Sequence, residues 1–265
     1  MKWEELTAPD FAKAVRDTET CVISFGVLER HSDHLPLGTD YLAGHRLAVL
    51  ATEKEPAVVF PPFYFGQIFE ARCFPGCLTI KPTLLLELVQ AVFDEMCRNG
   101  FKKIVVHNGH GGNWHMLGFL AQASLWEQKP YTVYVQQEWL TDDRKKEWDA
   151  ILETKLHGHA CECETSYVMV DYPDAVKMDR VPETPASDMA RMKHLPKGTF
   201  AGISWYASYP EHYSGDARPA SAEKGKKLQA LLVDSLAEFI AAVKADKVAP
   251  ALEAEFFDRE RKLRE

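Results

Sequence analysis

The amino-acid sequence predicts an α/β fold of three layers, α/β/α, with a mainly parallel sheet at its centre. Apolar strand candidates rich in β-branched residues alternate with helical stretches along the chain, which is typical of βαβ units. Their nearly continuous apolar runs suit strands that are buried on both faces. The chain has 265 residues, of which 46% are hydrophobic, and no repeat or linker divides it. We therefore expect a single domain over residues 1–265.

The predicted elements follow in order along the chain. A first strand over residues 21–28 precedes a helix over 41–52, which has apolar Leu42, Leu47 and Leu50. Further strands are predicted at 58–60, 103–107 and 131–135, and further helices at 84–97 and 220–243. Prolines interrupt 56–82 and 178–197, which are predicted loops. The aromatic residues of 56–82 line either a pocket or a subunit contact, and 253–265 is either a helical arm or a frayed tail.

A first group of polar residues follows the first strand. Glu29 and His31 are two residues apart, so in an extended chain their side chains face one cavity while Arg30 faces away. Asp40 stands where the next helix begins and has two interpretations. It is an N-cap, a role that Thr39 can share, or it is a metal ligand whose two carboxylate oxygens can hold two cations.

A second group surrounds His110, after the strand 103–107. Glycines at a strand end let the backbone turn tightly or approach a ligand closely, which exposes an imidazole placed among them. A phosphate-binding loop is the competing interpretation, but neither the dinucleotide-binding nor the Walker pattern is present. Metal ligation by His110 is therefore the better prediction.

A third group lies between residues 157 and 166, which include two histidines, two glutamates and two cysteines. Glu164 begins a helical run, so its carboxylate can project into a crevice from the start of a helix. Glu162 is expected to be solvated, although the choice between the two glutamates as a ligand stays open. His159 and Glu164 are the candidates for catalysis.

The cysteines of this group allow a different metal site. Zinc binding by Cys161 and Cys163 is possible, but C-x-C is a weak spacing and no second cysteine pair lies at the distance of a zinc ribbon. Buried free cysteines are ordinary core residues. The six cysteines of the chain show no disulfide framework, which fits a reducing compartment and predicts a cytoplasmic protein.

Taken together, the three groups resemble the signatures of the creatininase (creatinine amidohydrolase) family. Residues 29–40, 108–113 and 159–166 match these signatures in order and spacing, and 219–225 is also similar. The resemblance implies two divalent cations, of zinc, manganese or iron. The residues at the matching positions are Glu29, His31, Asp40 and His110, with Asp40 as the bridge and Glu164 as a further ligand. It also implies that His159 acts as the acid or base beside the metals.

The chain departs from the creatinine-hydrolysing members at Gly112, where those members carry a glutamate ligand. Members with the Gly-Gly version act on formamide, peptide or cyclic-ketone substrates. Arg30 replaces a glutamine, and His157 stands where an aspartate is usual. We expect a metal-dependent amidohydrolase that cleaves the C–N bond of a small cyclic or linear amide. The alternatives are a hydrolase that cleaves a C–C bond of a cyclic sugar ketone such as a keto-inositol, or a formamide deformylase.

Other polar residues of the three groups are expected to orient the ligands. His34, Asn108 and Asn113 are the candidates for this role. For His34 and His107 the alternative is a buried histidine whose hydrogen bonds are satisfied within the core.

Charge and hydropathy exclude two classes of partner. The net charge of −8 argues against nucleic acid and against an anionic membrane surface, because either needs a basic face. No secretory signal or transmembrane span is visible. A small-molecule substrate is expected, and the family resemblance implies a homo-oligomer, with a hexamer suspected.

Overall fold

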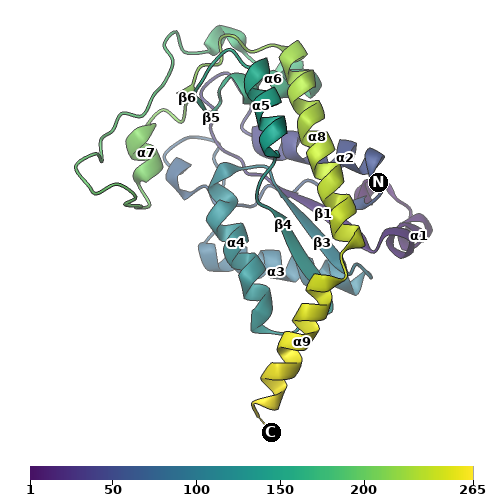
Figure 1. Ribbon diagram of the computed structural model, residues 1–265. Helices are drawn as coiled ribbons and strands as arrows, with labels where there is room; N and C mark the ends of the chain where they lie inside the picture. The colour runs from purple at the N-terminus through teal and green to yellow at the C-terminus, as the bar shows by residue number, and fades with distance from the viewer. Residues whose placement is uncertain (265) are drawn as a thin grey trace.

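The computed structural model describes residues 1–264 and contains the predicted parallel sheet (Figure 1). Its four strands lie in the order β2-β1-β3-β4, and each neighbouring pair runs parallel. They are β1 (Thr20–Phe25), β2 (Val58–Val59), β3 (Lys103–Asn108) and β4 (Thr132–Gln136). Each predicted strand is therefore present, with slightly different ends, and the α/β class is confirmed.

Helices cover both faces of this sheet, as the three-layer prediction requires (Figure 1). One face packs against α1 (Ala8–Thr18), α3 (Pro82–Arg98) and α4 (Trp114–Ala123). The other face packs against α2 (Thr39–Lys54) and α8 (Ala222–Ala245). Two shorter helices, α5 (Asp142–Ile151) and α6 (Glu162–Asp171), lie against α8.

Strand β1 shows why the apolar runs predict this arrangement. All its side chains are buried. Ile23 and Phe25 belong to the core beneath α3, whereas Val22 belongs to the core beneath α2 and α8. A strand covered on both faces carries apolar residues without alternation, because neither side of it meets water.

The close approach of α2 to the end of β1 places the first polar group. The ladder of β1 ends at Gly26, whose N–H donates to the carbonyl of Phe63 at 3.1 Å. A Cβ at Gly26 would lie 2.3 Å from the backbone nitrogen of Tyr41, so only glycine lets the two segments touch. As a result the first turn of α2 lies beside the chain that leaves β1.

The remaining elements lie outside the three layers. Strands β5 (His157–His159) and β6 (Ser214–Gly215) form an antiparallel pair, and a long arm that carries α7 (Ser204–Ser208) extends from the body (Figure 1). The predicted loop 178–197 packs against the body at Val181 and Ala186, leads into this arm and contains one short 3-10 helix at Met178–Arg180. Of the two interpretations of the C-terminal segment, the helical arm is correct, because α9 (Val248–Lys262) projects from the sheet.

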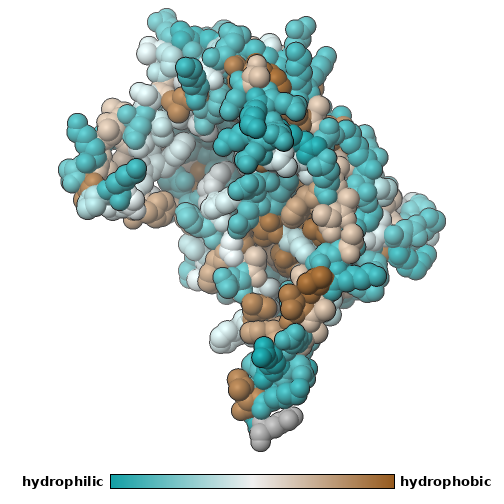
Figure 2. Space-filling view, viewed as in Figure 1, coloured by the Kyte–Doolittle hydropathy of each residue, from teal (hydrophilic) through white to brown (hydrophobic). Residues whose placement is uncertain are grey.

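Two features of the surface bear on partners. Hydrophobic residues gather around the start of α9 (Figure 2), where Val248, Leu252 and Phe256 are exposed at intervals of one helical turn. Within residues 1–264, no helix is both long and apolar enough to span a bilayer.

Candidate metal centre

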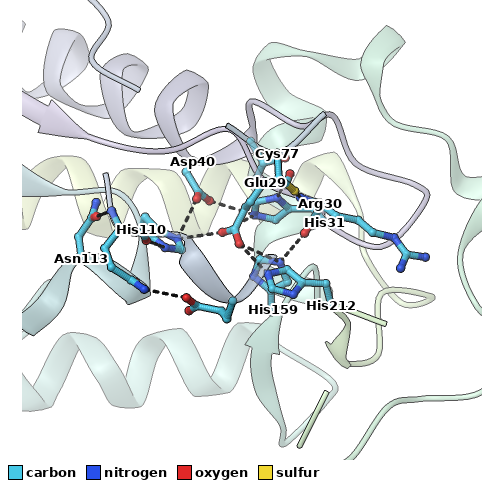
Figure 3. Close-up of polar contacts among 12 residues, drawn as sticks. Glu29, Arg30, His31, Asp40, Cys77, His110, Asn113, His159 and His212 are labelled. Carbon is cyan, nitrogen blue, oxygen red and sulfur yellow. Dashed lines mark hydrogen bonds and ion pairs between the residues drawn. The ribbon is translucent and has the colours of Figure 1, made fainter. Parts of the chain in front are cut away.

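Glu29 and His31 follow β1, and their side chains lie close together. The N–H of Glu29 donates to the carbonyl of Leu37 at 3.0 Å, and Glu29 Oε1 lies 3.9 Å from His31 Nε2. Both side chains are fully buried. Arg30 points away from them, as expected (Figure 3). Its guanidinium pairs with the exposed carboxylates of Asp33 and Glu211.

Asp40 is not a helix cap, and the N-cap interpretation is wrong for Thr39 as well. The N-cap of α2 is Gly38, and the Thr39 hydroxyl donates to the carbonyl of Pro36 instead. The Asp40 side chain is buried and separates its two oxygens between two imidazoles. Oδ1 lies 2.9 Å from His31 Nε2, and Oδ2 lies 3.0 Å from His110 Nδ1.

His110 follows β3 and completes this arrangement (Figure 3). Its Nδ1 lies 2.8 Å from Glu29 Oε1, while its Nε2 lies 2.9 Å from the carbonyl oxygen of Gln67. Because a carbonyl only accepts, Nε2 carries the proton and Nδ1 is left for a cation. The Asn113 side chain accepts from the N–H of Gln67 at 2.8 Å, and Asn108 accepts from the N–H of His110 at 3.2 Å. Both asparagines thus fix the orientation of His110.

The two glutamates of α6 point in different directions, and only Glu164 lies with other possible ligands. Glu164 lies with His31 and Asp40 in a group whose ligand atoms are all within 4.8 Å of one another. We expected Glu162 to be solvated, and this prediction is wrong, because its side chain is fully buried. Its carboxylate accepts from the N–H groups of Glu153 at 3.0 Å and Thr154 at 2.7 Å, and it pairs with Lys224.

The donor set fits a pair of cations. Glu29, Asp40 and His110 form one group of possible ligands, His31, Asp40 and Glu164 form a second, and Asp40 is shared. Glu29 Oε1, His31 Nε2 and Asp40 Oδ2 are buried, and their contacts of 2.8–3.0 Å with one another's side chains and with His110 do not form hydrogen bonds among residues 1–264. Buried polar atoms are rarely left without partners, so atoms that converge in this way suit coordination of an ion.

The electrostatics of the site also favour cations. Burial alone lowers the pKa of His31, but the carboxylates of Asp40 and Glu29 outweigh it and raise that pKa to about 10. Burial raises the pKa of Glu164 to about 8, against the opposing effect of His31. The raised pKa of His31 expresses the negative charge of the carboxylates around it, which a divalent cation can neutralise, and the raised pKa of Glu164 expresses the cost of a buried carboxylate without such a cation.

His159 lies beside the two ligand groups that share Asp40 and belongs to neither of them. Its ring centroid is 4.2 Å from that of His31, and its Nε2 donates to the carbonyl of Arg30 at 2.9 Å. Burial lowers the pKa of His159 to about 3; nearby Glu29 opposes this shift, whereas His31 and His212 add to it. His159 also groups with Glu29 and His31 as a possible ligand set.

His212 is a site residue that the sequence did not predict. It is buried, and its Nε2 donates to Glu29 Oε2 at 2.8 Å (Figure 3). Its ring stands at right angles to that of His159, with centroids 4.8 Å apart. The ring of Phe74 packs against that of His212, with centroids 5.5 Å apart. Phe63 and Phe65 of the same aromatic segment pack against the core instead.

The two remaining buried histidines separate into the two roles considered for them. His34 Nε2 lies 2.9 Å from the hydroxyl of Thr165, next to Glu164, so it supports the ligand helix. His107 Nδ1 lies 3.0 Å from the side-chain oxygen of Gln136 and has no contact with the site, which makes it a core histidine.

Comparison with known proteins identifies the family. The model of the creatininase family, described as creatinine amidohydrolase, matches residues 4–240. The chain belongs to the creatininase family. The match covers nearly the whole chain and includes every residue of the two ligand groups.

Curated relatives in this family differ in their reactions. A 3-dehydro-scyllo-inosose hydrolase of Thermotoga maritima is 24% identical over 90% of this chain and 82% of its own length. A mycofactocin precursor peptide peptidase of Mycolicibacterium smegmatis is 27% identical over 83% of each chain. A creatinine amidohydrolase of Pseudomonas putida is 26% identical over 89% of this chain and 94% of its own length.

Solved structures share the fold. A creatininase mutant of the Zn-Zn type superimposes with a TM-score of 0.78, at 22% identity, over 92% of this chain and 98% of its own. A creatininase described as the Mn form gives a TM-score of 0.76, also at 22% identity, over 92% of this chain and 99% of its own. These structures confirm the predicted fold class.

Proposed function

We propose that this protein is a hydrolase that uses two divalent cations. Glu29, Asp40 and His110 would hold one cation, and His31, Asp40 and Glu164 would hold the other, with Asp40 as the bridge. One observation carries the proposal: the two oxygens of Asp40 face different histidines, at 2.9 and 3.0 Å. A carboxylate shared in this way is how two-metal sites join their ions.

The donor set limits the choice of ion. Both groups offer only carboxylate and imidazole ligands, which suit zinc, manganese and iron. The solved relatives of Zn-Zn and Mn types support the first two.

The residues around the cations have distinct roles in this proposal. When bound, such a pair supplies an activated water and a Lewis acid for the substrate carbonyl. His159 exchanges a proton with the leaving group, because Nε2 is held by Arg30 and Nδ1 remains for that task. Glu164 anchors its cation from the start of α6, and His212 holds the Glu29 carboxylate in place. His110 is fixed through Gln67.

For the substrate we propose a small cyclic or linear amide that is cleaved at its C–N bond. Gly112 argues against creatinine as the substrate. A Cβ there would lie 2.4 Å from His110 Nε2 and 2.6 Å from the side-chain oxygen of Gln67. The side chains of His110 and Gln67 thus leave no room for the glutamate that the creatinine-hydrolysing members carry at this position. Formamides remain within this substrate class.

A second candidate is hydrolysis of a C–C bond in a cyclic sugar ketone. The 24% identical relative from Thermotoga maritima, a 3-dehydro-scyllo-inosose hydrolase, supports it. Attack of an activated water on a ketone carbonyl needs the same cation pair, and only the leaving group changes from nitrogen to carbon. The cation site therefore serves both candidates.

Metal content of purified protein tests the two-cation site. Asp40→Asn is expected to lose both catalytic cations and all activity, since it removes the shared ligand. Asp33→Asn is the matched control, because that carboxylate lies on the same loop but is exposed and pairs with Arg30. Full metal content in the Asp40 variant would refute the two-cation reading.

A substrate panel separates the two reactions. Wild-type protein is assayed against creatinine, formamides, small cyclic amides and keto-inositols. We expect turnover of an amide and little turnover of creatinine. Activity confined to keto-inositols would select the second candidate, and creatinine turnover comparable to that of amides would refute the Gly112 argument.

The exposed apolar residues of α9 support a homo-oligomer. Val248, Leu252 and Phe256 line one side of a helix that projects from the body, and such a stripe is usually covered in solution. Light scattering after gel filtration measures the subunit number directly, and a monomer would refute this proposal.

A further inference from the structure

A second group of metal-ligating side chains lies apart from the shared carboxylate. His157, Cys161 and Cys163 offer three ligand atoms that are all within 4.8 Å of one another. The two sulfur atoms are 3.3 Å apart, and both cysteines are free and buried. None of these residues belongs to the ligand groups that contain Asp40.

The local backbone explains why His157 and His159 serve different sites. In a regular strand, residues two apart face the same side. Strand β5 instead changes register between them as it pairs with β6. Ala160 then adopts a left-handed conformation with φ of +53°, which turns the chain into α6. His159 consequently faces the cluster of Glu29 and His31, while His157 stays with the cysteines.

The two sulfur atoms are surrounded by apolar side chains and are shielded from solvent. Cys161, at the N-cap of α6, and Cys163 pack with Leu152 and Leu228, and Trp148 adds to this apolar cover. His157 is only half-buried, so one side of the group is accessible to an ion from solution.

We propose that His157, Cys161 and Cys163 bind a thiophilic divalent cation, of which zinc is the type, in a site independent of the catalytic pair. Thiolate and imidazole are the ligands that zinc prefers, whereas the catalytic set contains no sulfur. Binding displaces the two thiol protons to solvent as the Sγ–metal bonds form. Three protein ligands leave a fourth position, which water can fill.

Glu162 does not supply that fourth ligand, although it lies between the two cysteines in the sequence. Its carboxylate is committed to the backbone N–H groups of Glu153 and Thr154 and to Lys224. This anchoring holds the first turn of α6 in place and keeps both sulfur atoms on one side. The site therefore exists before an ion arrives.

Cobalt(II) titration provides a direct test, because thiolate ligation gives an intense near-ultraviolet charge-transfer band that carboxylates and imidazoles do not give. The full-length protein is reduced, stripped of metal and titrated with Co²⁺. We expect the band in the wild type and in Asp40→Asn, and its loss in the double variant Cys161→Ser, Cys163→Ser. The double variant Cys73→Ser, Cys97→Ser is the matched control and is expected to keep the band.

Zinc stoichiometry gives a second readout. The wild type is expected to bind one more equivalent of zinc per chain than the Cys161 and Cys163 double variant. Should that variant fail to fold, His157→Asn keeps both thiols and removes a half-buried ligand. It is expected to weaken cobalt binding by at least about tenfold, since removal of a residue that only hydrogen-bonds to a metal ligand already lowers metal affinity by that factor.

Three results would overturn the proposal. They are no band in the reduced wild type, a band that survives the double variant at Cys161 and Cys163, and a disulfide that forms between these cysteines under metal-loading conditions with no zinc bound. Failure here leaves the metal loss of Asp40→Asn unaffected, and failure of the two-cation site leaves the sulfur band unaffected. The two proposals are thus tested separately.

Discussion

The hydrogen bond from His212 to Glu29 makes a quantitative prediction about metal affinity. Among residues 1–264, His212 Nε2 is the only hydrogen-bond donor to Glu29 Oε2, at 2.8 Å, and both side chains are almost wholly buried. A buried hydrogen bond to a charged group contributes about 1.5–3 kcal/mol. If that energy is lost from the cation-binding conformation of Glu29, affinity falls by about 10- to 100-fold, since about 1.4 kcal/mol corresponds to a factor of ten. Loss of an outer partner of a metal ligand has effects of the same size.

The backbone at His212 guides the choice of variant. Its φ of +51° is left-handed, and asparagine adopts this conformation more readily than alanine does. His212→Asn therefore removes the reach of the imidazole with little added strain. His212→Gln restores a donor at nearly the length of the imidazole and is expected to recover part of the affinity.

Competition with a chromophoric chelator measures the zinc affinity of each variant. His107→Asn is the control, because His107 is also buried and hydrogen-bonded, but to Gln136 and away from the site. We expect it to lower thermal stability and leave zinc affinity unchanged. If His212→Asn binds zinc as tightly as the wild type, His212 does not position Glu29 and the reasoning is wrong.

Two glycines predict further outcomes, each with a matched glycine as control. Gly112→Ala is expected to lower amidase activity and destabilise the fold by about 1–3 kcal/mol, because its Cβ would lie 2.4 Å from His110 Nε2. A Cβ at Gly111 would meet no atom within 4 Å, so Gly111→Ala is expected to keep activity and stability. Equal losses in the two variants would contradict this explanation. Gly225→Ala is expected to cost about 3 kcal/mol or more in urea unfolding, because its Cβ would lie 1.9 Å from a carbonyl oxygen of α6. Gly118→Ala in α4, with its nearest neighbour 3.9 Å away, is expected to stabilise by about 0.5–1 kcal/mol; destabilisation there would show that the clash is not the cause.

The parts of the structure that local patterns control could be predicted from the sequence. Continuous apolar runs indicated β1 and β3, and the spacing of two residues indicated that the side chains of Glu29 and His31 lie close together. Since the strands are parallel neighbours, their carboxyl ends meet, which brings His110 to the same place. These inferences need only the period of a strand and the edge of a sheet.

The choice between two uses of one residue depends on packing that the local sequence does not contain. Asp40 before a helix is consistent with both a cap and a ligand, and the outcome was decided by Gly26, against which α2 begins. Glu162 and Glu164 are two residues apart on a helix and so point in nearly opposite directions. Which of them faces the site depends on Lys224, which lies 62 positions further along the chain.

Contacts from loops were beyond prediction for a different reason. His212 meets Glu29 across 183 positions, and Gln67 meets His110 across 43. Both residues lie in segments without helical or strand periodicity, so no pattern indicates where their side chains point. Only the folded arrangement reveals that His212 belongs to the site.

The same distinction explains why the family does not fix the substrate. The proposed ligands lie at the ends of β1 and β3 and at the starts of α2 and α6, all held by the core. The groups around His159 come instead from the arm and from a loop: the ring centroid of Trp205, in the short helix α7 of the arm, lies 5.8 Å from that of His159, and Phe74 of a loop contacts His212. Loops change more freely than the core that carries them, which is consistent with relatives of different activity in one family. The residues that select the substrate are therefore to be sought on the arm and on the segment around Phe74, rather than among the ligands themselves.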